Sequence, residues 1–222
     1  MLTYLAVNGS PGAASLYSRY SFNDGTASDS ITQNAAGTLM GTPSVVGGKV
    51  ELSGAEYISL PTTLPSASPG GISFEMWVDT YSSDIVSAML IYLGANSGGN
   101  GEGIYAYNNG GVVSVEWTSS SCGTDLGQTF DNHIGMHFVF TIDNFNSVNV
   151  YVNGEFSLNL ACSSGTWPDL SYFYIGSPDH PLYASLDEVR VWAGVLSAVD
   201  VAEHYSQGPG AKLLIYGSVD NL

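Results

Sequence analysis

SLDEVRVWAGVLSAVDVAEHY, residues 185–205, changes from the pattern of a strand to the pattern of a helix within a few residues. Alternate residues of a strand point to opposite faces, so Asp187, Val189 and Val191 are predicted to share one apolar face. A lone carboxylate is costly to bury beside valines. Asp187 is therefore expected to have a partner there, either a basic group, a hydrogen-bond donor or a cation.

The second half of this segment predicts one short helix. Ser197 suits the N-cap position, and Gly208-Pro209 is a typical stop signal. The apolar residues expected to pack against the rest of the chain are Val199, Val201, Ala202 and Tyr205. We therefore expect a final core strand followed by a single helix.

The DEVRVW strand and the LSAVDVAEHY helix are the last of four segments that follow one another in a recognisable order. The others are residues 20–30, residues 72–78, and residues 137–143 leading to 150–154. Together they resemble the laminin G-like jelly roll of the concanavalin A-like lectin and glucanase superfamily. The resemblance covers about residues 20–207 and implies an all-β fold, a two-sheet antiparallel β-sandwich with one short helix near the C-terminus.

Length and composition favour a single domain. A chain of 222 residues with 44% hydrophobic residues can bury one full core. We expect one domain over residues 1–222, with extra terminal strands at 1–19 and 208–222. Residues 1–12 lack the features of a signal peptide, so we expect a mature or excised chain.

The charge balance excludes several classes of partner. Four Lys and Arg residues against 20 Asp and Glu give a formal charge of -16, which repels nucleic-acid phosphates and anionic membranes. No apolar run approaches the length of a membrane span. Charged residues make up only 11% of the chain, a balance that is common in secreted β proteins. We therefore expect a location outside the cell or on its surface.

Cys122 and Cys162, the two cysteines of the chain, each end a strand-like run beside serines. They are expected to form a disulfide, which implies an oxidising compartment. The bridge would close a loop of about 40 residues and contribute roughly 3–4 kcal/mol. The alternative is two unrelated buried thiols.

The loop at residues 23–29 offers two carboxylates and several carbonyl oxygens, which are the hard ligands that calcium prefers. In the laminin G-like family, this loop and the aspartate of the final strand can share a metal. The resemblance therefore implies a structural calcium site at Asp24, Asp29 and Asp187. The alternative is that Asp24 and Asp29 cap turns while Asp187 pairs with an internal donor.

Enzyme activity is not expected, although glucanases share the superfamily. Glu75 and Asp79 stand four residues apart on one strand, about 13 Å, which exceeds the separation that a glycosidase pair needs. Glu116 has no acidic neighbour in sequence. The four histidines, His133, His137, His180 and His204, form no recognisable set with a serine and an aspartate.

Exposed aromatic residues are the candidates for sugar contact, because a flat ring stacks on the C–H face of a sugar. The candidate ligand-binding residues are Tyr105, Tyr107, Trp117, Trp167 and Tyr172. The alternative is that these rings fill the core or line its edges. Asn8 opens the sequon Asn8-Gly9-Ser10, a possible glycosylation site.

We therefore expect a non-enzymatic extracellular recognition module for glycans or extracellular proteins. The alternative is a structural subunit of a filament, joined to copies of itself through its terminal strands. Leu213–Tyr216 has strand character and is expected to pair with Tyr4–Val7 of its own chain. In the filament alternative it adds to the sheet edge of another copy.

The disulfide is directly testable. We expect that no thiol reacts when the unfolded, unreduced protein is titrated with a thiol reagent, and that two react after reduction. Two reactive thiols before reduction would contradict the bridge.

Overall fold

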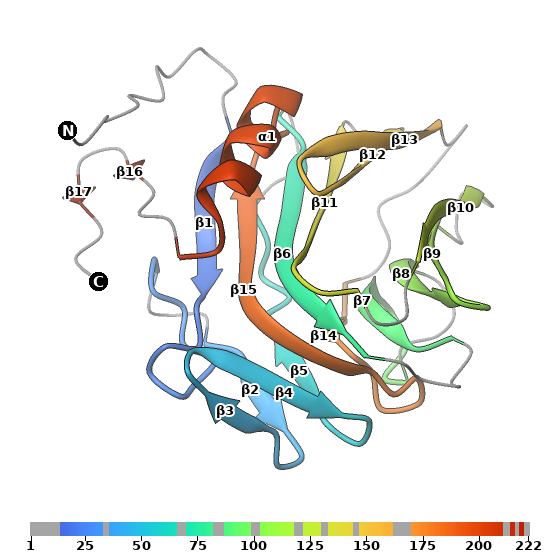
Figure 1. The fold of residues 1–222 in the computed structure, drawn as a ribbon. Coiled ribbons are helices and arrows are strands. Elements are labelled where there is room, and N and C mark those ends of the chain that lie inside the picture. Colours follow the sequence, from blue (N-terminus) through green and yellow to red (C-terminus); the bar gives the residue numbers. More distant parts are fainter. Residues whose placement is uncertain are drawn as a thin grey trace.

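The structure, a computed structural model, describes residues 14–32, 36–65, 70–81, 87–98, 103–117, 122–129, 133–143, 147–161, 170–210, 214–215 and 218–219. Two antiparallel sheets face each other, and the helix α1 lies on the outer side of one of them (Figure 1). The predicted two-sheet antiparallel β-sandwich with a single short helix near the C-terminus is confirmed.

Among the described residues, the first sheet has eight strands, and β6 and β15 lie at its centre. Its order is β13 (Glu155–Ala161), β12 (Ser147–Val152), β11 (Met136–Asp143), β6 (Ile72–Thr80), β15 (Tyr183–Ala193), β4 (Lys49–Ser53) and β3 (Ser44–Val46). The eighth strand, β1 (Ser15–Tyr20), pairs with the second half of β15.

The second sheet has seven strands in the described part of the chain. Its order is β10 (Cys122–Thr129), β9 (Val112–Trp117), β8 (Gly103–Asn109), β7 (Met89–Gly94), β14 (Tyr172–Ile175), β5 (Tyr57–Leu60) and β2 (Thr38–Met40). The sequence pattern does not predict β10, because CGTDLGQT is rich in residues that strands avoid. Its pairing with β9 holds this strand in place.

The core lies between the inner faces of the two sheets. Every second residue of β6, beginning at Ile72, is fully buried there. The Phe74 ring stacks on Phe140 of the neighbouring strand β11 at 4.8 Å and meets the edge of Phe173 from the opposite sheet at 5.5 Å. Burying each such side chain contributes about 1.5–3 kcal/mol.

A β-bulge at Asp187 resets the alternation of the final strand. Along β6, Leu186 pairs with Val78 while Glu188 pairs with the next residue, Trp77, so Asp187 is the extra residue. Leu186 lies in the core, and Asp187 lines a half-open pocket on the outer face. The prediction that Asp187 shares the apolar face of the following valines is therefore wrong.

The helix α1 (Ala198–Gln207) begins and ends where the sequence predicts. Ser197 is its N-cap and forms a capping box with Asp200, in which each side chain bonds the other residue's backbone N–H. Gly208 ends the helix with a φ of 78°, which glycine adopts without strain.

The buried side of α1 differs from the prediction. Val201 and His204 are buried, whereas Val199 is 74% exposed and Tyr205 is 42% exposed. The predicted stripe fails because α1 packs on a polar surface of the sheet, where a histidine finds partners that another valine would not.

Glu75 is the centre of this polar surface. It lies on the outer face of β6, fully buried beneath α1. Its Oε1 atom is 2.9 Å from His137 Nε2 and 3.0 Å from His204 Nδ1, and its Oε2 atom accepts a hydrogen bond from Trp192 Nε1 at 2.8 Å. A carboxylate only accepts hydrogen bonds, so each facing ring nitrogen carries a hydrogen. The Arg190 guanidinium lies 3.6 Å from Oε2.

Arg190 connects this cluster to a second buried carboxylate, Glu188. Arg190 Nε donates to Glu188 at 3.3 Å, and Arg19 of β1 donates to the same carboxylate from Nε at 3.0 Å. Arg190 also donates to the carbonyl of Pro209 just beyond α1 at 2.7 Å, and its guanidinium lies 4.5 Å from the centre of the Trp77 ring. The network thus ties β1, β6, β15, β11 and α1 together.

The described part of the C-terminal segment forms a small two-stranded sheet. β16 (Leu214–Ile215) pairs with β17 (Ser218–Val219), two strands of the same terminal segment. The predicted partner, Tyr4–Val7, lies outside the described residues. Pairing with another copy of the chain stays a prediction.

Replacing Glu75 should test the polar cluster. Glu75→Gln removes the charge that two histidines and Arg190 face, so we expect a loss of about 3–5 kcal/mol in the free energy of unfolding, measured with urea. The exposed Glu155→Gln on β13 should change it by less than about 0.5 kcal/mol. Equal stability of wild type and Glu75→Gln would contradict a stabilising role.

The same cluster predicts acid sensitivity. Burial lowers the pKa of His137, so below about pH 6.5 the unfolded chain binds a proton more readily than the folded one. Burial works to raise the pKa of Glu75, but hydrogen bonds from His137 and His204 hold it well below its usual range. Stability should fall as the pH drops below about 6.5, and again below about 4.5. The loss of stability below about pH 4.5 should be smaller in Glu75→Gln than in wild type, as measured by thermal unfolding at each pH.

Candidate carbohydrate-binding face

A row of tyrosines crosses the outer face of the seven-stranded sheet. Alternation on β5, β14, β7 and β8 turns one side chain of each pair inward to the core and the next outward. The outward residues are Tyr57, Tyr172, Tyr174, Tyr92, Tyr105 and Tyr107, packed with Met89. We call these six tyrosines the tyrosine face.

Ring contacts run along the whole row. The Tyr57 and Tyr174 ring centres are 5.1 Å apart, Tyr174 lies 6.3 Å from Tyr92, and Tyr92 lies 6.3 Å from Tyr105. The row ends at Tyr107, 5.5 Å from Tyr105. Such contacts rigidify the rings and leave little entropy to lose when a ligand binds.

Burial divides the row into a base and a surface. Tyr92 and Tyr174 are buried, and the Tyr92 hydroxyl accepts a hydrogen bond from Asn96 N at 3.0 Å. Tyr57, Tyr105, Tyr107 and Tyr172 are only half-buried. Burial raises the pKa of Tyr174 to about 12 and raises the pKa of Tyr105 still further. These hydroxyls stay protonated in neutral solution and can donate hydrogen bonds.

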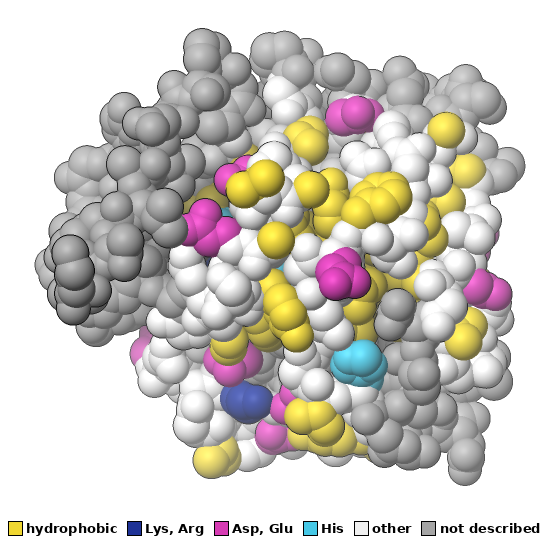
Figure 2. Space-filling view, turned by 45° about the horizontal axis from the view of Figure 1, so that its top comes forward, with side chains coloured by type: hydrophobic (Ala, Val, Ile, Leu, Met, Phe, Trp, Pro, Cys, Tyr) yellow, Lys and Arg dark blue, Asp and Glu magenta, His cyan; other side chains and the backbone are white. Residues whose placement is uncertain are grey.

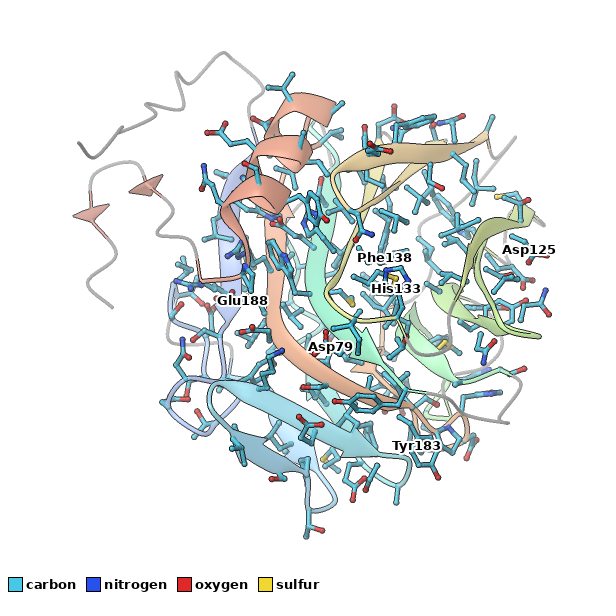
Figure 3. The ribbon with its side chains drawn as sticks, viewed as in Figure 1. Asp79, Asp125, His133, Phe138, Tyr183 and Glu188 are labelled. Carbon is cyan, nitrogen blue, oxygen red and sulfur yellow. The ribbon has the colours of Figure 1, made fainter. Side chains whose placement is uncertain are left out.

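A polar groove of about 600 Å³ adjoins the Tyr107 end of the row, over β8, β9 and β10. We call it the acidic groove. Its lining residues are Tyr107, Asn109, Ser114, Val115, Glu116, Cys122, Gly123, Thr124 and Asp125. Figure 3 shows Asp125 on β10, at the opposite side of the view from Glu188.

Two carboxylates in the acidic groove are held by neighbouring side chains. Asp125 accepts hydrogen bonds from Ser114 Oγ and from Asn109 Nδ2, the latter at 3.0 Å, and these bonds hold its pKa below the usual range. The Tyr107 hydroxyl donates to Glu116 at 3.4 Å. The groove therefore presents fixed acceptors beside aromatic rings, an arrangement that suits a polyhydroxylated ligand.

The structure brings three of the five predicted ligand-binding residues together. Tyr105, Tyr107 and Tyr172 lie on the tyrosine face. Trp117 does not, because its side chain is fully buried in the core between the sheets. Trp167 lies outside the described residues.

Sequence reasoning missed Tyr57, Tyr92, Tyr174 and Asp125. Tyr172 and Tyr174 stand two residues apart, and this alternation is a signal that places both on one face. Asp125 carried no signal, because β10 itself was not predicted. Glu116, which has no acidic neighbour in sequence, shares the acidic groove with Asp125.

The other acidic and histidine residues of the sequence analysis lie elsewhere. Glu75 is buried with its oxygens bound, as described above, while Asp79 accepts from Lys49 Nζ at 3.0 Å and from Gly135 N at 2.6 Å. His137 and His204 contact Glu75. Glu75 thus contacts the two histidines beneath α1, and Asp79 pairs with Lys49 on the same sheet.

The three aspartates of the predicted calcium site line two different pockets. Asp24 and Asp29 line one with residues of the same loop, and Asp187 lines the pocket beside α1. Asp24 accepts from Thr26 N at 2.9 Å, and Asp29 accepts from Arg19 N at 3.0 Å. Among the described residues, no three His, Cys, Asp or Glu side chains group at metal-binding spacing. The three-carboxylate set does not fit, and calcium binding stays a prediction.

A calcium titration separates these cases. Because Asp187 lies in another pocket, any change in melting temperature with calcium or chelator should be the same in wild type and Asp187→Asn. Asp24→Asn should remove a response that arises in the loop. Loss of the response in Asp187→Asn alone would restore the three-carboxylate site.

Two other expectations fall partly or wholly outside the described residues. Cys122 begins β10, but Cys162 and Asn8 are not described, so the disulfide and the glycosylation stay predictions. Within the described part of the chain, the helix is too short and too polar to cross a membrane.

Comparison with known proteins agrees with the geometry. Residues 52–202 match the family model of the concanavalin A-like lectin/glucanases superfamily, in its laminin G-like branch. No curated protein sequence matches the chain significantly.

Solved structures with the same fold are similar over most of this chain. Domain 4 of an extracellular arabinanase from Geobacillus stearothermophilus, in complex with arabinotriose, is 20% identical; the match covers 86% of this chain and 98% of that domain, with a TM-score of 0.68. Botulinum neurotoxin type C, whose cell entry depends on two ganglioside molecules, is 13% identical over 86% of this chain and 51% of its own, with a TM-score of 0.68. Trypanosoma rangeli sialidase in complex with sialic acid is 15% identical over 90% and 33%, with a TM-score of 0.69. At these identities the likeness establishes the fold alone.

Proposed function

Because the chain belongs to the concanavalin A-like lectin and glucanase superfamily, we propose that it is a carbohydrate-binding module. The ligand lies along the tyrosine face and extends into the acidic groove. The observation that carries this proposal is the continuous row of six tyrosines beside fixed acidic acceptors. The arabinotriose and sialic acid complexes of proteins with this fold support the ligand class.

The charge of the groove selects the kind of glycan. Glu116 and Asp125 both line it, and the chain carries a formal charge of -16. A sialylated glycan would bring another carboxylate to these groups, at a cost in electrostatic repulsion. Neutral oligosaccharides instead offer hydroxyl donors to the two carboxylates and C–H faces to the half-buried rings. We therefore propose a neutral oligosaccharide as the ligand.

The proposed activity is binding rather than hydrolysis. A glycosidase needs one carboxyl that remains protonated until it donates to the leaving group. Hydrogen bonds from Ser114 and Asn109 lower the pKa of Asp125, which favours an acceptor over an acid catalyst. Incubation with oligosaccharides should release no new reducing ends. If the wild type released reducing ends and Glu116→Gln did not, the groove would instead be an active site.

We further propose that the module works outside the cell. The predicted disulfide and the low share of charged residues, 11%, are consistent with this location.

The binding face can be tested by calorimetry with neutral oligosaccharides, arabinotriose among them, and with sialylated ones. Tyr105→Ala should weaken binding of the neutral ligand roughly tenfold, because it removes a ring from the centre of the contact. Asp125→Asn should also weaken it by removing an anionic acceptor. Phe156→Ala, which truncates an aromatic residue that is 56% exposed on the opposite sheet, is the matched control and should bind like wild type.

Three results would contradict the proposal. Tyr105→Ala could bind as tightly as wild type while remaining folded, or Phe156→Ala could lose as much affinity as Tyr105→Ala. Preference for sialylated over neutral glycans would contradict the charge argument.

A further inference from the structure

A second pocket, of about 210 Å³, lies on the outer face of the eight-stranded sheet beside the C-terminal end of α1. It arises where β15 exchanges one neighbour for another: β4 pairs with β15 up to Leu186, and β1 pairs with it from Val189 onward. The bulged residue Asp187 falls in the interval. The lining residues are Lys49, Trp77, Val78, Asp79, Gly135, Ser185, Asp187, Tyr205, Gly208 and Pro209.

Two polar groups of this pocket lack partners among the described residues. The Ser185 side chain is 2% exposed, and its Oγ atom has no hydrogen-bond partner. The Tyr81 hydroxyl donates to Glu51 at 3.2 Å and lies near the Ser185 hydroxyl, but the two hydroxyls do not meet hydrogen-bond geometry. Asp187 is half-buried and accepts no hydrogen bond from the described residues. Buried polar groups of this kind are costly unless something pairs with them.

The charges of the pocket favour a cationic ligand. Asp79 forms an ion pair with Lys49 at 3.0 Å. Arg190 forms ion pairs with Glu75 and Glu188 and donates a hydrogen bond to the Pro209 carbonyl. Asp187 has no direct ion pair, and Lys49 and Arg190 act on its carboxylate only through longer-range attraction, so two carboxylates face one ammonium group in this pocket. The pocket is also rimmed by Gly208 and Pro209, at the end of α1 where the helix dipole favours cations. Figure 2 shows acidic side chains beside a basic one on this side of the molecule.

We propose that this pocket binds a protonated primary amine. An ammonium group carries three donors, which match the Asp187 carboxylate, the Ser185 hydroxyl and the remaining acceptor capacity of Asp79. Trp77 and Tyr205 provide apolar walls for the carbon atoms next to the nitrogen. A divalent metal fits less well, because only two carboxylates line the pocket and one is bound to Lys49. The volume suits one amine-bearing group, such as an alkylamine or a single amino sugar.

The test uses the full chain and three probes: glucosamine, its neutral relative N-acetylglucosamine, and n-butylamine. Chemical shifts of the pocket residues should change with at least one amine and should not change with N-acetylglucosamine at the same concentration, and calorimetry should give the affinity for the amine. Glucosamine binding alone would identify a sugar as the carrier, and n-butylamine binding an alkyl chain. Equal shifts of the pocket residues with glucosamine and N-acetylglucosamine, or no shift there with either amine, would overturn the proposal.

Two pocket variants and one control variant test where the amine binds. Asp187→Asn should weaken amine binding about tenfold or more, since it removes a charged hydrogen bond. Ser185→Ala should also weaken binding yet leave the melting temperature unchanged or higher, because it deletes a buried hydroxyl without a partner. The exposed Glu155→Gln is the charge-matched control and should bind like wild type. Unaltered amine binding in both pocket variants would overturn the assignment.

This pocket and the tyrosine face lie on different sheets, so their tests are independent. Tyr105→Ala should leave amine binding unchanged, and Asp187→Asn should leave oligosaccharide binding unchanged. Parallel loss of both activities in either variant would contradict two separate sites.

Discussion

The buried carboxylate of Glu75 is the constraint on which the outer face of the eight-stranded sheet depends. An isolated charge in such a place would cost several kcal/mol. It is stable only because His137, His204 and Trp192 converge on it from β11, α1 and β15. Two of these three partners follow Glu75 by more than 100 residues. The cluster therefore forms only when β6 has paired with β11 and β15 and α1 has packed on the sheet. The cluster thereby selects the position of the helix.

The docked helix in turn shapes the proposed amine pocket. Tyr205, Gly208 and Pro209 form one side of it, and Arg190 holds the chain there through the Pro209 carbonyl.

The outer face of the seven-stranded sheet is covered in a different way. It carries no covering helix among the described residues, and tyrosines protect it: each ring buries apolar surface against its neighbours and keeps a hydroxyl at the edge. The two faces of one sandwich thus present different chemistry, charged and enclosed on one side, aromatic and open on the other.

The sequence was most informative where a local pattern has one structural solution. Ser197 and Gly208 mark the ends of α1, and the alternation in Ile72–Val78 marks a core strand. It was least informative at β10, whose glycines and aspartate give no strand signal. That strand exists because β9 offers it hydrogen bonds, and with it come Asp125 and one wall of the acidic groove. The predicted sugar contact at Trp117 was wrong for a related reason, since sequence alone does not say which face of β9 turns inward.

The sequence by itself determined the all-β class, the final strand with its helix, the acidic character and the presence of tyrosines at alternating positions. These features depend on the period of the backbone and on composition, which act locally. Only the tertiary structure decided where the carboxylates lie. One extra residue in β15 moved Asp187 from the predicted apolar face to an outer pocket, and strand pairing placed Asp125 beside Glu116. Bulges and strand order are set by the fit of whole sheets, and no local pattern in the chain encodes them.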